Sequence, residues 1–500
     1  MKKFDQSKTP YLDALKEYVN TDILPLDVPG HHMGNVDNLF KDYIGDLTYN
    51  CDVNAPRGLD NLNHPNGVIE ESQKLMAECY HADEAFFLIN GTSSGILAMI
   101  MATVKAHEEI ILPRNCHKSV INALILSGAI PVFVMPQFDK NLEISNQPTI
   151  DDYIDKINKH PNAKAIFVIN PTYFGATNDL KRLAEVAHQN NMICLADEAH
   201  GAHLSFHNAL PISAIDAGFD LSAVSMHKTG GALTQASVLL RSGNRVTHYD
   251  VFKALMVVNT TSPSNLLIAS LESARHYLYF HGEEKLDEII KLGNEAREEI
   301  NKIPGLKARG RDYFIKQGSY AYDCTKLVIE VESLTINGFE LYNILKDEYN
   351  VQMELAEQYV VLAILAIGTK KEHLINLINA LKDISKKYYV EKRTYPKYQY
   401  DSPFPKMVMR PRVAYQAPVK RVKLDDAIGL ISKESIMIYP PGIPLIIPGE
   451  VFDQSIIDRI KLYKKTKATV LMDYDDLTVS TVDYQKYLEN RGNVEDRFDD

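Results

Sequence analysis

The sequence is poor in cysteine and has no long apolar run. None of its five cysteines belongs to a Cys-x-x-Cys pair; they are Cys51, Cys79, Cys116, Cys194 and Cys324. An odd number of scattered cysteines argues against a disulfide scaffold and against a zinc site, and predicts a reducing compartment. No run approaches the roughly 18 apolar residues that a membrane span needs. No apolar segment follows the charged start, so we expect no signal peptide and a cytoplasmic location.

Positive charge is also scarce. The 500 residues carry 54 Lys and Arg against 65 Asp and Glu, which gives a formal net charge of -11. Such a balance is unfavourable for binding nucleic acid or an anionic membrane, so we expect neither as a partner. A negative field favours cationic substrates instead. The chain contains no internal repeat and no low-complexity tract.

The chain is too long for one ordinary hydrophobic core, and its pattern predicts four parts. Residues 1–70 hold one helix, near 11–19, among loops rich in proline and glycine, and we expect them to wrap a larger domain or a partner subunit. Residues 71–300 form the predicted large domain. Residues 301–390 form a smaller α+β domain, and residues 391–500 form a C-terminal domain.

Seven short apolar segments alternate with helical patterns between residues 70 and 245. Near-continuous apolar strands separated by helices are typical of a mostly parallel sheet that is covered on both faces. We therefore predict an α/β fold with a seven-stranded sheet, whose ligands bind beyond the carboxyl ends of the strands. The predicted strands are residues 85–89, 109–112, 130–134, 165–169, 192–196, 221–224 and 237–240. Helices are expected at 95–106, 119–126 and 180–190, and farther on at 263–281 and 284–303.

A turn of small residues, Asn-Gly-Thr-Ser-Ser-Gly at 90–95, follows the first predicted strand. Gly91 lets a ligand approach the backbone, and the helix that follows presents free amide groups to an anion. Thr92, Ser93 and Ser94 add hydroxyl donors. The same residues are also ordinary helix caps. The turn is not a P-loop, because no Gly-Lys-Ser/Thr follows at the required spacing.

His117 opens a predicted helix after the strand at 109–112, within Arg114-Asn115-Cys116-His117-Lys118-Ser119. Its ring could stack on a planar cofactor, or it could simply cap the helix. Nothing near Cys116 in the sequence forms a Cys-His-Asn arrangement, so we interpret this cysteine as structural.

An acidic, histidine-rich segment, residues 197–203, follows the strand at 192–196. A carboxylate such as Asp197 beside a pyridinium nitrogen keeps that nitrogen protonated, which makes the ring an electron sink. A metal site with His200, His203 and His207 is the alternative. We expect no metal, because His200 and His203 fall on a glycine-containing turn rather than on one helix face.

Lys228 follows the strand at 221–224, in Ser225-Met226-His227-Lys228-Thr229-Gly230-Gly231. A buried ammonium group is costly, and a lysine whose pKa is lowered by burial can react with an aldehyde cofactor. Alone, the segment is explained as well by a solvent-facing lysine at a strand end. Four features thus follow successive strands along the chain: first the anion-binding turn, then His117, then Asp197, then Lys228. This order is typical of a pyridoxal-phosphate enzyme with the aspartate-aminotransferase fold.

Seven blocks together resemble the Orn/Lys/Arg decarboxylase family of bacterial fold-type I pyridoxal-phosphate enzymes. The resemblance runs from about residue 20 to 450 in the family's order, and the length is similar to that of the short Gram-positive-type members, many of which are arginine decarboxylases. The blocks are Pro29-Gly30-His31, Gly91-Thr92-Ser93, Arg114-Asn115-Cys116-His117-Lys118-Ser119, Asn170-Pro171-Thr172-Tyr173-Phe174-Gly175, Asp197-Glu198-Ala199-His200-Gly201, Ser225-Met226-His227-Lys228 and Tyr439-Pro440-Pro441-Gly442-Ile443-Pro444.

The resemblance implies pyridoxal 5′-phosphate as cofactor and a role for each of these residues. Lys228 forms the covalent link to the cofactor, Asp197 pairs with its pyridine nitrogen, and His117 and Ala199 pack on the two faces of the ring. It also implies at least a homodimer with the active site at the interface. The implied phosphate ligands are Gly91, Thr92, Ser93, Ser225 and His227, with Thr261, Ser262 and Ser264 reaching the phosphate of a neighbouring subunit.

The implied reaction is decarboxylation of a basic amino acid, first L-arginine to agmatine and CO2, then lysine, then ornithine. Lys228 or His200 returns a proton to Cα, and Glu434 is a candidate for binding the cationic end of the substrate, although it fits an ordinary surface glutamate as well. The alternatives are an aminotransferase, a β-eliminating lyase, and a homologue that binds the cofactor without turnover. His32 replaces the family's usual lysine, and Tyr49 replaces a frequent acidic residue, both near the substrate entrance.

Overall fold

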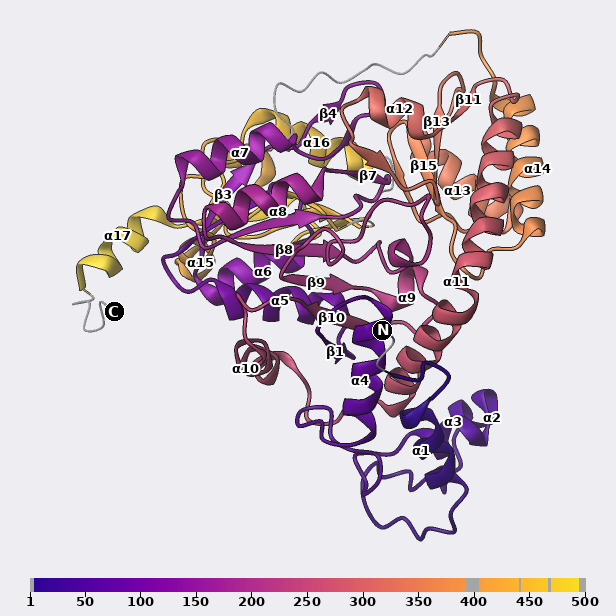
Figure 1. The fold of residues 1–500 in the computed structure, drawn as a ribbon. Coiled ribbons are helices and arrows are strands. Elements are labelled where there is room, and N and C mark those ends of the chain that lie inside the picture. Colours follow the sequence, from indigo (N-terminus) through magenta and orange to yellow (C-terminus); the bar gives the residue numbers. More distant parts are fainter. Residues whose placement is uncertain (1–3, 393–403, 440–441, 466–468, 494–500) are drawn as a thin grey trace.

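The computed structural model describes residues 4–392, 404–439, 442–465 and 469–493 (Figure 1). A seven-stranded sheet crosses its centre in the order β1-β10-β9-β8-β6-β2-β3. β10 runs antiparallel to β1 and β9, whereas the other neighbouring pairs are parallel. The predicted mostly parallel sheet is therefore confirmed. Its strands are β1 (Glu84–Leu88), β2 (Glu109–Pro113), β3 (Ile130–Val134), β6 (Ala165–Ile169), β8 (Ile193–Glu198), β9 (Leu221–Val224) and β10 (Ser237–Arg241).

Helices cover both faces of this sheet, which explains why its strands are apolar throughout. In β1, Phe86 and Leu88 pack into one core, and Ala85 and Phe87 pack into another on the opposite face, as the alternation of a strand requires. One face carries α5 (Gly91–Thr103), α6 (Lys118–Ser127) and α10 (His248–Val258). The other carries α7 (Ile150–Lys159) and α8 (Leu180–Gln189), as Figure 1 shows. The shorter elements here are β4 (Phe138–Asp139), β5 (Ile144–Ser145), β7 (Ala176–Thr177), η1 (Leu204–Phe206) and α9 (Met226–Thr229).

The long helix α11 (Asn265–Ile300) corrects one prediction. We expected two helices separated near residue 283, but the 36 residues form one. Gly282 falls within it, and a Cβ there would lie 3.2 Å from the Cβ of Phe206, so glycine permits close packing rather than ending the helix. The N-terminal part of α11 packs with the start of the chain, and its C-terminal part packs against a second sheet.

This second sheet is antiparallel, with the strand order β11-β13-β15-β14. Its strands agree with the predicted α+β pattern after residue 304. The elements are β11 (Leu306–Arg309), α12 (Arg311–Lys316), β12 (Ala321–Tyr322), β13 (Lys326–Val331), α13 (Gly338–Tyr349), β14 (Leu355–Glu357), β15 (Val360–Ile364) and α14 (Lys371–Tyr388). β12 pairs with β7, which joins this part of the chain to the central one.

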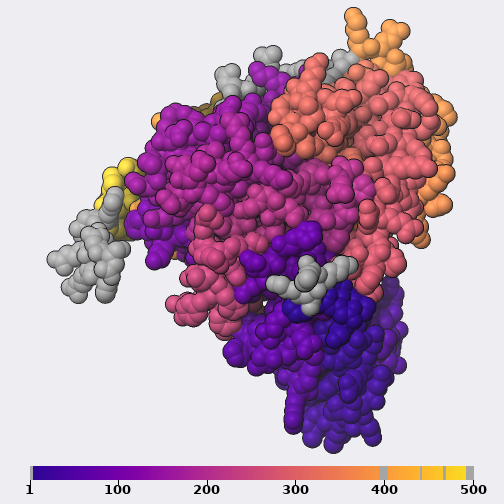
Figure 2. Space-filling view, in the orientation of Figure 1, coloured from indigo at the N-terminus to yellow at the C-terminus, as the bar shows by residue number. Residues whose placement is uncertain are grey.

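The N-terminal residues form a lobe that projects from the body (Figure 2). Its helices are α1 (Pro10–Val19), α2 (Leu39–Ile44), α3 (Asp46–Cys51) and α4 (Val68–Cys79). The buried Tyr11 donates a hydrogen bond to Asn265 of α11 over 2.7 Å, which ties the lobe to the long helix. Several large apolar side chains of the lobe are exposed, among them Leu24 at 81%, Leu39 at 89% and Tyr43 at 88%.

The C-terminal part lies behind the central sheet and is joined to it by a buried ion pair. The Arg114 guanidinium at the end of β2 meets Glu450 through two bonds, Nε to Oε1 at 2.6 Å and Nη2 to Oε2 at 2.7 Å. No described helix is both long and apolar enough to cross a membrane. The elements are α15 (Pro411–Gln416), β16 (Val419–Lys423), η2 (Leu424–Ala427), β17 (Ile436–Ile438), β18 (Pro444–Ile446), α16 (Gln454–Lys465), β19 (Val470–Leu471), β20 (Thr478–Val482) and α17 (Tyr484–Asn493).

Candidate active site

A cavity of about 860 Å³ opens at the carboxyl ends of the central strands, where the fold class predicts a ligand. Loops after β1, β2, β6, β8 and β9 contribute to its wall, together with single residues from the second sheet and the C-terminal part. Ten of the predicted site residues line it. They are Gly91, Thr92, Ser93, His117, Asp197, Ala199, His200, Ser225, His227 and Lys228.

One end of the cavity is formed by the N-terminus of α5. The helix begins at Gly91, four residues earlier than predicted, with this glycine at a positive φ of 71°. The Thr92 hydroxyl is hydrogen-bonded to Ser225 and to Ser237, the latter at 3.1 Å. The Ser93 side chain is exposed, while Ser94 donates to the Gly91 carbonyl over 2.8 Å. The Ser94 hydroxyl is therefore used within its own helix and is not the free donor that we expected.

His117 is confirmed as a helix cap, and its ring also faces the cavity. It is the N-cap of α6, where its Nδ1 accepts a hydrogen bond from the Ser119 amide, and its ring lines the cavity. Burial, with Lys228 and Lys118 nearby, lowers the pKa of His117 to about 4, so the ring is neutral at neutral pH. The adjacent Cys116 is buried, and burial raises the pKa of its thiol to about 12, which supports a structural role.

Asp197 lies in β8, because this strand continues two residues beyond the predicted end. Its side chain is buried, and Oδ1 accepts a hydrogen bond of 3.0 Å from the Ala199 amide. Burial raises the pKa of Asp197, and the Ala199 amide and the Lys228 charge offset only part of this rise. No residue in the described part of the chain forms an ion pair with it. A cationic ligand group at this position would therefore stabilise the carboxylate.

Lys228 projects from the single turn of α9, and its Nζ lies 3.0 Å from the Nε2 of His200. Burial lowers the pKa of Lys228, although Asp197 and Glu354 act in the opposite direction. Burial, with Lys228 as the next cause, also holds the pKa of His200 well below its usual value. The imidazole is therefore neutral, and its Nε2 shares a hydrogen bond with the Lys228 amine. Its other nitrogen, Nδ1, has no hydrogen-bond partner among the described residues.

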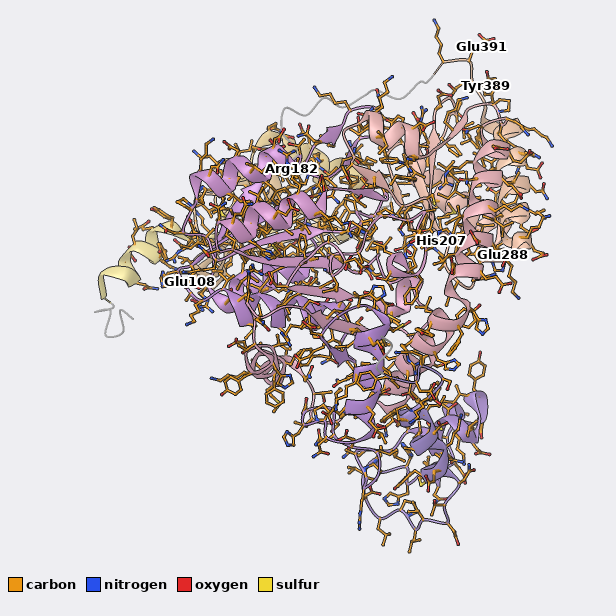
Figure 3. The ribbon with its side chains drawn as sticks, viewed as in Figure 1. Glu108, Arg182, His207, Glu288, Tyr389 and Glu391 are labelled. Carbon is orange, nitrogen blue, oxygen red and sulfur yellow. The ribbon has the colours of Figure 1, made fainter. Side chains whose placement is uncertain are left out.

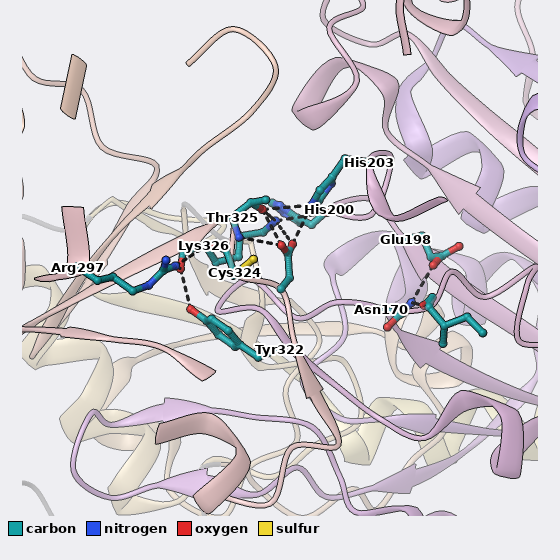
Figure 4. Close-up of polar contacts among 11 residues, drawn as sticks. Asn170, Glu198, His200, His203, Arg297, Tyr322, Cys324, Thr325 and Lys326 are labelled. Atoms are coloured by element: carbon teal, nitrogen blue, oxygen red, sulfur yellow. Dashed lines mark hydrogen bonds and ion pairs between the residues drawn. The ribbon is translucent and has the colours of Figure 1, made fainter. Parts of the chain in front are cut away.

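A network of buried charges lies behind His200 (Figure 4). Lys326 Nζ is 2.6 Å from Asp323 Oδ2, and the same oxygen is 3.1 Å from His203 Nε2. Burial alone would raise the pKa of Asp323, but Lys326 and His203 hold that pKa well below its usual range. Lys326 also donates to the backbone carbonyl of His200 over 3.5 Å. The network thus connects the second sheet to the backbone of the cavity wall.

The three histidines of the metal alternative do not converge. His200 contacts Lys228, His203 contacts Asp323, and the half-buried His207 pairs with Asp287 of α11 at 2.8 Å. Figure 3 shows His207 beside α11, where Glu288 is also labelled. The one close group of metal-ligand residue types in the described chain is His188, Cys194 and Asp220, and there Asp220 already accepts from His188 and from the Cys194 amide.

Tyr173 and Glu354 are among the residues of the cavity wall that received no role in the sequence analysis. The Tyr173 ring centroid lies 4.3 Å from that of His200 and 5.5 Å from the Lys228 ammonium. Tyr173 belongs to a block that we had noted for its resemblance alone. Glu354, just before β14, also lines the cavity. In the sequence, Glu354 is marked only by being an acidic residue within the apolar segment 353–356.

Other predicted residues lie outside this chain's own cavity wall. Glu434 is buried, its carboxylate accepts hydrogen bonds from the Ser480 and Asp473 amides, and burial raises its pKa to about 7. The structure thus gives Glu434 backbone partners and does not place it at the cavity. Pro440 and Pro441 are outside the described residues. The remaining residues that do not line the cavity are His32, Tyr49, Thr261, Ser262 and Ser264.

Comparisons with family models and with known proteins indicate the same family. The family model for the Orn/Lys/Arg decarboxylase major domain matches residues 9–314, and the model for the C-terminal domain of the same family matches residues 393–470. An arginine decarboxylase of Halalkalibacterium halodurans is 39% identical over 459 residues, which cover 91% of this chain and 93% of the relative. An arginine decarboxylase of Bacillus subtilis is 38% identical over 457 residues, with the same coverage.

Solved structures share the fold. A lysine decarboxylase of Francisella novicida superposes with a TM-score of 0.81 at 20% identity, covering 95% of this chain and 81% of that one. A ureidoglycine-glyoxylate aminotransferase of Bacillus subtilis superposes with a TM-score of 0.53 at 13% identity, covering 65% and 86%. The predicted fold-type I architecture, with smaller parts added after the large domain, is therefore confirmed.

Proposed function

The chain belongs to the Orn/Lys/Arg decarboxylase family, and from this premise we propose that it decarboxylates a basic amino acid with pyridoxal 5′-phosphate. We propose L-arginine as the substrate, giving agmatine and CO2, with lysine and ornithine as the second and third candidates. The observation that carries the proposal is a buried lysine in a cavity that also presents a buried carboxylate, a neutral histidine ring and a helix N-terminus. The arginine preference rests on the names of the relatives.

The residues present fit this cofactor. The α5 N-terminus, the Ser93 hydroxyl and His227 are available to a phosphate at one end of the cavity, beside the hydrogen-bonded Thr92 and Ser225. His117 and Ala199 would hold the two faces of a flat ring, and Asp197 would hold its protonated nitrogen. When bound, the cofactor supplies an aldehyde for an amine and an electron-poor ring that takes up the electron pair of the broken C–C bond.

The protein's own groups would hold and move protons. Because burial favours the neutral amine of Lys228, Nζ is available as a nucleophile. His200 Nε2 shares a hydrogen bond with this amine and would hold it at the cavity wall. Either of the two is placed to return a proton to the substrate Cα after CO2 has left, and Asp197, when ionised, keeps the positive charge of the ring nitrogen in place.

We propose that the enzyme works as a homodimer or a larger homo-oligomer, in which one subunit completes the cavity of the next. The exposed apolar side chains of the N-terminal lobe support this, because such a surface is usually covered. Ser264 is the N-cap of α11 and does not line its own cavity, and we propose that it reaches the partner's cofactor. The five unpaired cysteines support a reducing, cytoplasmic location.

One experiment tests the proposed reaction. The purified protein, loaded with pyridoxal phosphate, is incubated with arginine, lysine and ornithine across mildly acidic to neutral pH, and the CO2 and amine are identified. Agmatine from arginine is the expected product. Formation of a keto acid without CO2 would make the protein an aminotransferase. Cofactor binding without turnover of any basic amino acid would instead favour a non-catalytic homologue.

A further inference from the structure

Glu354 is the second carboxylate of the cavity. Among the described residues that line the cavity, the acidic ones are Asp197, at the end of the central sheet, and Glu354, from the second sheet. The Glu354 amide donates to Leu362 of β15 over 2.9 Å, which holds its backbone in place. Met353 and Leu355 on either side are buried in apolar cores. These buried neighbours hold the bend at residue 354 in place, and Glu354 itself lines the cavity.

Unlike four buried acids of the surrounding structure, the half-buried Glu354 has no partner among the described residues. Glu198 accepts hydrogen bonds from Asn170, Ser222 and Ala214. Three more buried acids have hydrogen-bond partners. Asp323 is bonded to Lys326, Glu434 accepts from backbone amides, and Glu450 is bonded to Arg114. No described side chain forms a hydrogen bond or an ion pair with the Glu354 carboxylate. A half-buried carboxylate held on a fixed backbone without a partner is a site for a cation.

The charges around Glu354 indicate which end of the substrate it meets. The described residues that line the cavity include no arginine, so no guanidinium is present to bind a substrate carboxylate there. Glu354 would repel the α-carboxylate of an amino acid. Asp197 lies at the end of β8 and Lys228 follows β9, whereas Glu354 reaches the same cavity from just before β14 of the second sheet. A substrate whose amine reacts at Lys228 therefore has its side chain free to extend toward Glu354.

We infer that Glu354 binds the positively charged side-chain end of the substrate. This inference rests on the proposed function and names the group that gives the site its preference for basic amino acids, the role for which Glu434 was the candidate from the sequence. A carboxylate offers two acceptor oxygens, which match the two parallel N–H groups of a guanidinium and hold an ammonium less specifically. Glu354 is thus a specificity-determining residue, while Lys228 and its neighbours carry out the chemistry.

The test compares Glu354→Gln with the wild type and with Glu372→Gln, a change at an exposed glutamate of the same part of the chain. The values of kcat/KM for arginine are measured on the holoenzymes, after the cofactor absorbance has shown equal loading. The loss of one charge-assisted contact predicts a fall of about 10- to 100-fold in Glu354→Gln. Glu354→Asp, which keeps the charge, should lose less, and Glu372→Gln should match the wild type. Unchanged kcat/KM in Glu354→Gln would overturn the inference.

Binding measurements separate this inference from the proposed function. Agmatine and (4-aminobutyl)urea have the same shape, but the urea tail is neutral, and calorimetry gives the affinity of each holoenzyme for both. The wild type should bind agmatine about 10-fold or more tightly than the urea. In Glu354→Gln the affinity for agmatine should fall while the affinity for the urea stays the same, so the preference is lost. If the wild type decarboxylates no basic amino acid, the proposed function fails, yet the loss of preference would still support Glu354 as the cation site. A preference retained in Glu354→Gln would reject Glu354 whether or not turnover occurs.

Discussion

The Nζ of Lys228 lies 3.0 Å from the Nε2 of His200, and burial disfavours the charged form of both groups. This pair differs from an ordinary surface contact because neither partner is stabilised by full hydration. The lysine is held against a neutral imidazole, and among nearby charges Asp197 opposes the lowering of the Lys228 pKa most strongly. A reactive amine and its proton acceptor are therefore already in contact inside the cavity.

Replacing Lys228 with alanine should abolish turnover. The change removes the amine that links to the cofactor, so we expect CO2 release from arginine to fall by at least about 1,000-fold. The absorbance of the lysine-linked cofactor should disappear as well. Lys253→Ala, at an exposed position of α10, is the control and should retain both signals. Persistence of the linked-cofactor absorbance in Lys228→Ala would show that another amine holds the cofactor.

Replacing His200 with glutamine should slow the reaction without removing the cofactor. Glutamine can still accept a hydrogen bond from Lys228, but it cannot transfer a proton. We expect kcat to fall by about 100-fold or more, the usual contribution of a general acid or base, while cofactor loading stays unchanged. Stopped-flow measurement of product formation, together with the cofactor absorbance, checks this. A kcat within about threefold of the wild type would assign the proton transfer to Lys228 alone.

The pH dependence of stability should include a contribution from Glu198. Burial raises the pKa of this carboxyl to about 7, well above its ordinary value of 4.5. A raised folded-state pKa means that the folded protein binds the proton more tightly than the unfolded chain. The contribution of Glu198 to stability is therefore greatest below about pH 4.5 and is lost as pH rises through about 7, a change on the order of 3 kcal/mol.

Glu198→Gln tests this prediction, because a glutamine can keep the same contacts. Its oxygen can accept from Asn170 and the Ala214 amide, and its NH2 group can donate to the Ser222 hydroxyl. Urea denaturation from pH 5 to 8 should therefore show a smaller loss of stability in the variant than in the wild type. Parallel curves for the two proteins would mean that Glu198 does not titrate in this window.

Much of the central fold could be predicted because its strands are buried on both faces. Every central strand was found within one residue of its predicted start, and the anion-binding turn, His117, Asp197 and Lys228 could be ordered along one sheet edge. The errors arose where tertiary contacts decide local structure. Packing against Phe206 keeps α11 continuous at Gly282, and the pairing of Asp197 with Ala223 extends β8. Glu354 could not be placed, because it lines the same cavity as Lys228 from more than a hundred residues farther along the chain.

The buried pair of Lys326 and Asp323 should be coupled in stability. Both side chains are fully buried, and they lie 2.6 Å apart. Removing one partner leaves an uncompensated charge, so Lys326→Met and Asp323→Leu should each lower the free energy of unfolding by about 3–5 kcal/mol. The double variant has no buried charge from this pair and should be clearly more stable than the sum of the two losses predicts.

The same cycle bears on the active site, because Lys326 also donates to the His200 carbonyl. If the pair positions His200, the double variant should regain stability without regaining the full kcat, and its KM for arginine should change little. Urea denaturation and steady-state kinetics on the four proteins supply both readouts, with Lys386→Met, an exposed lysine paired with Asp383, as the control. Recovery of stability and kcat together would limit the pair to a structural role. A kcat that stays low in a stable double variant would identify Lys326 as a positioning residue, acting on the Lys228 amine through the backbone that carries His200.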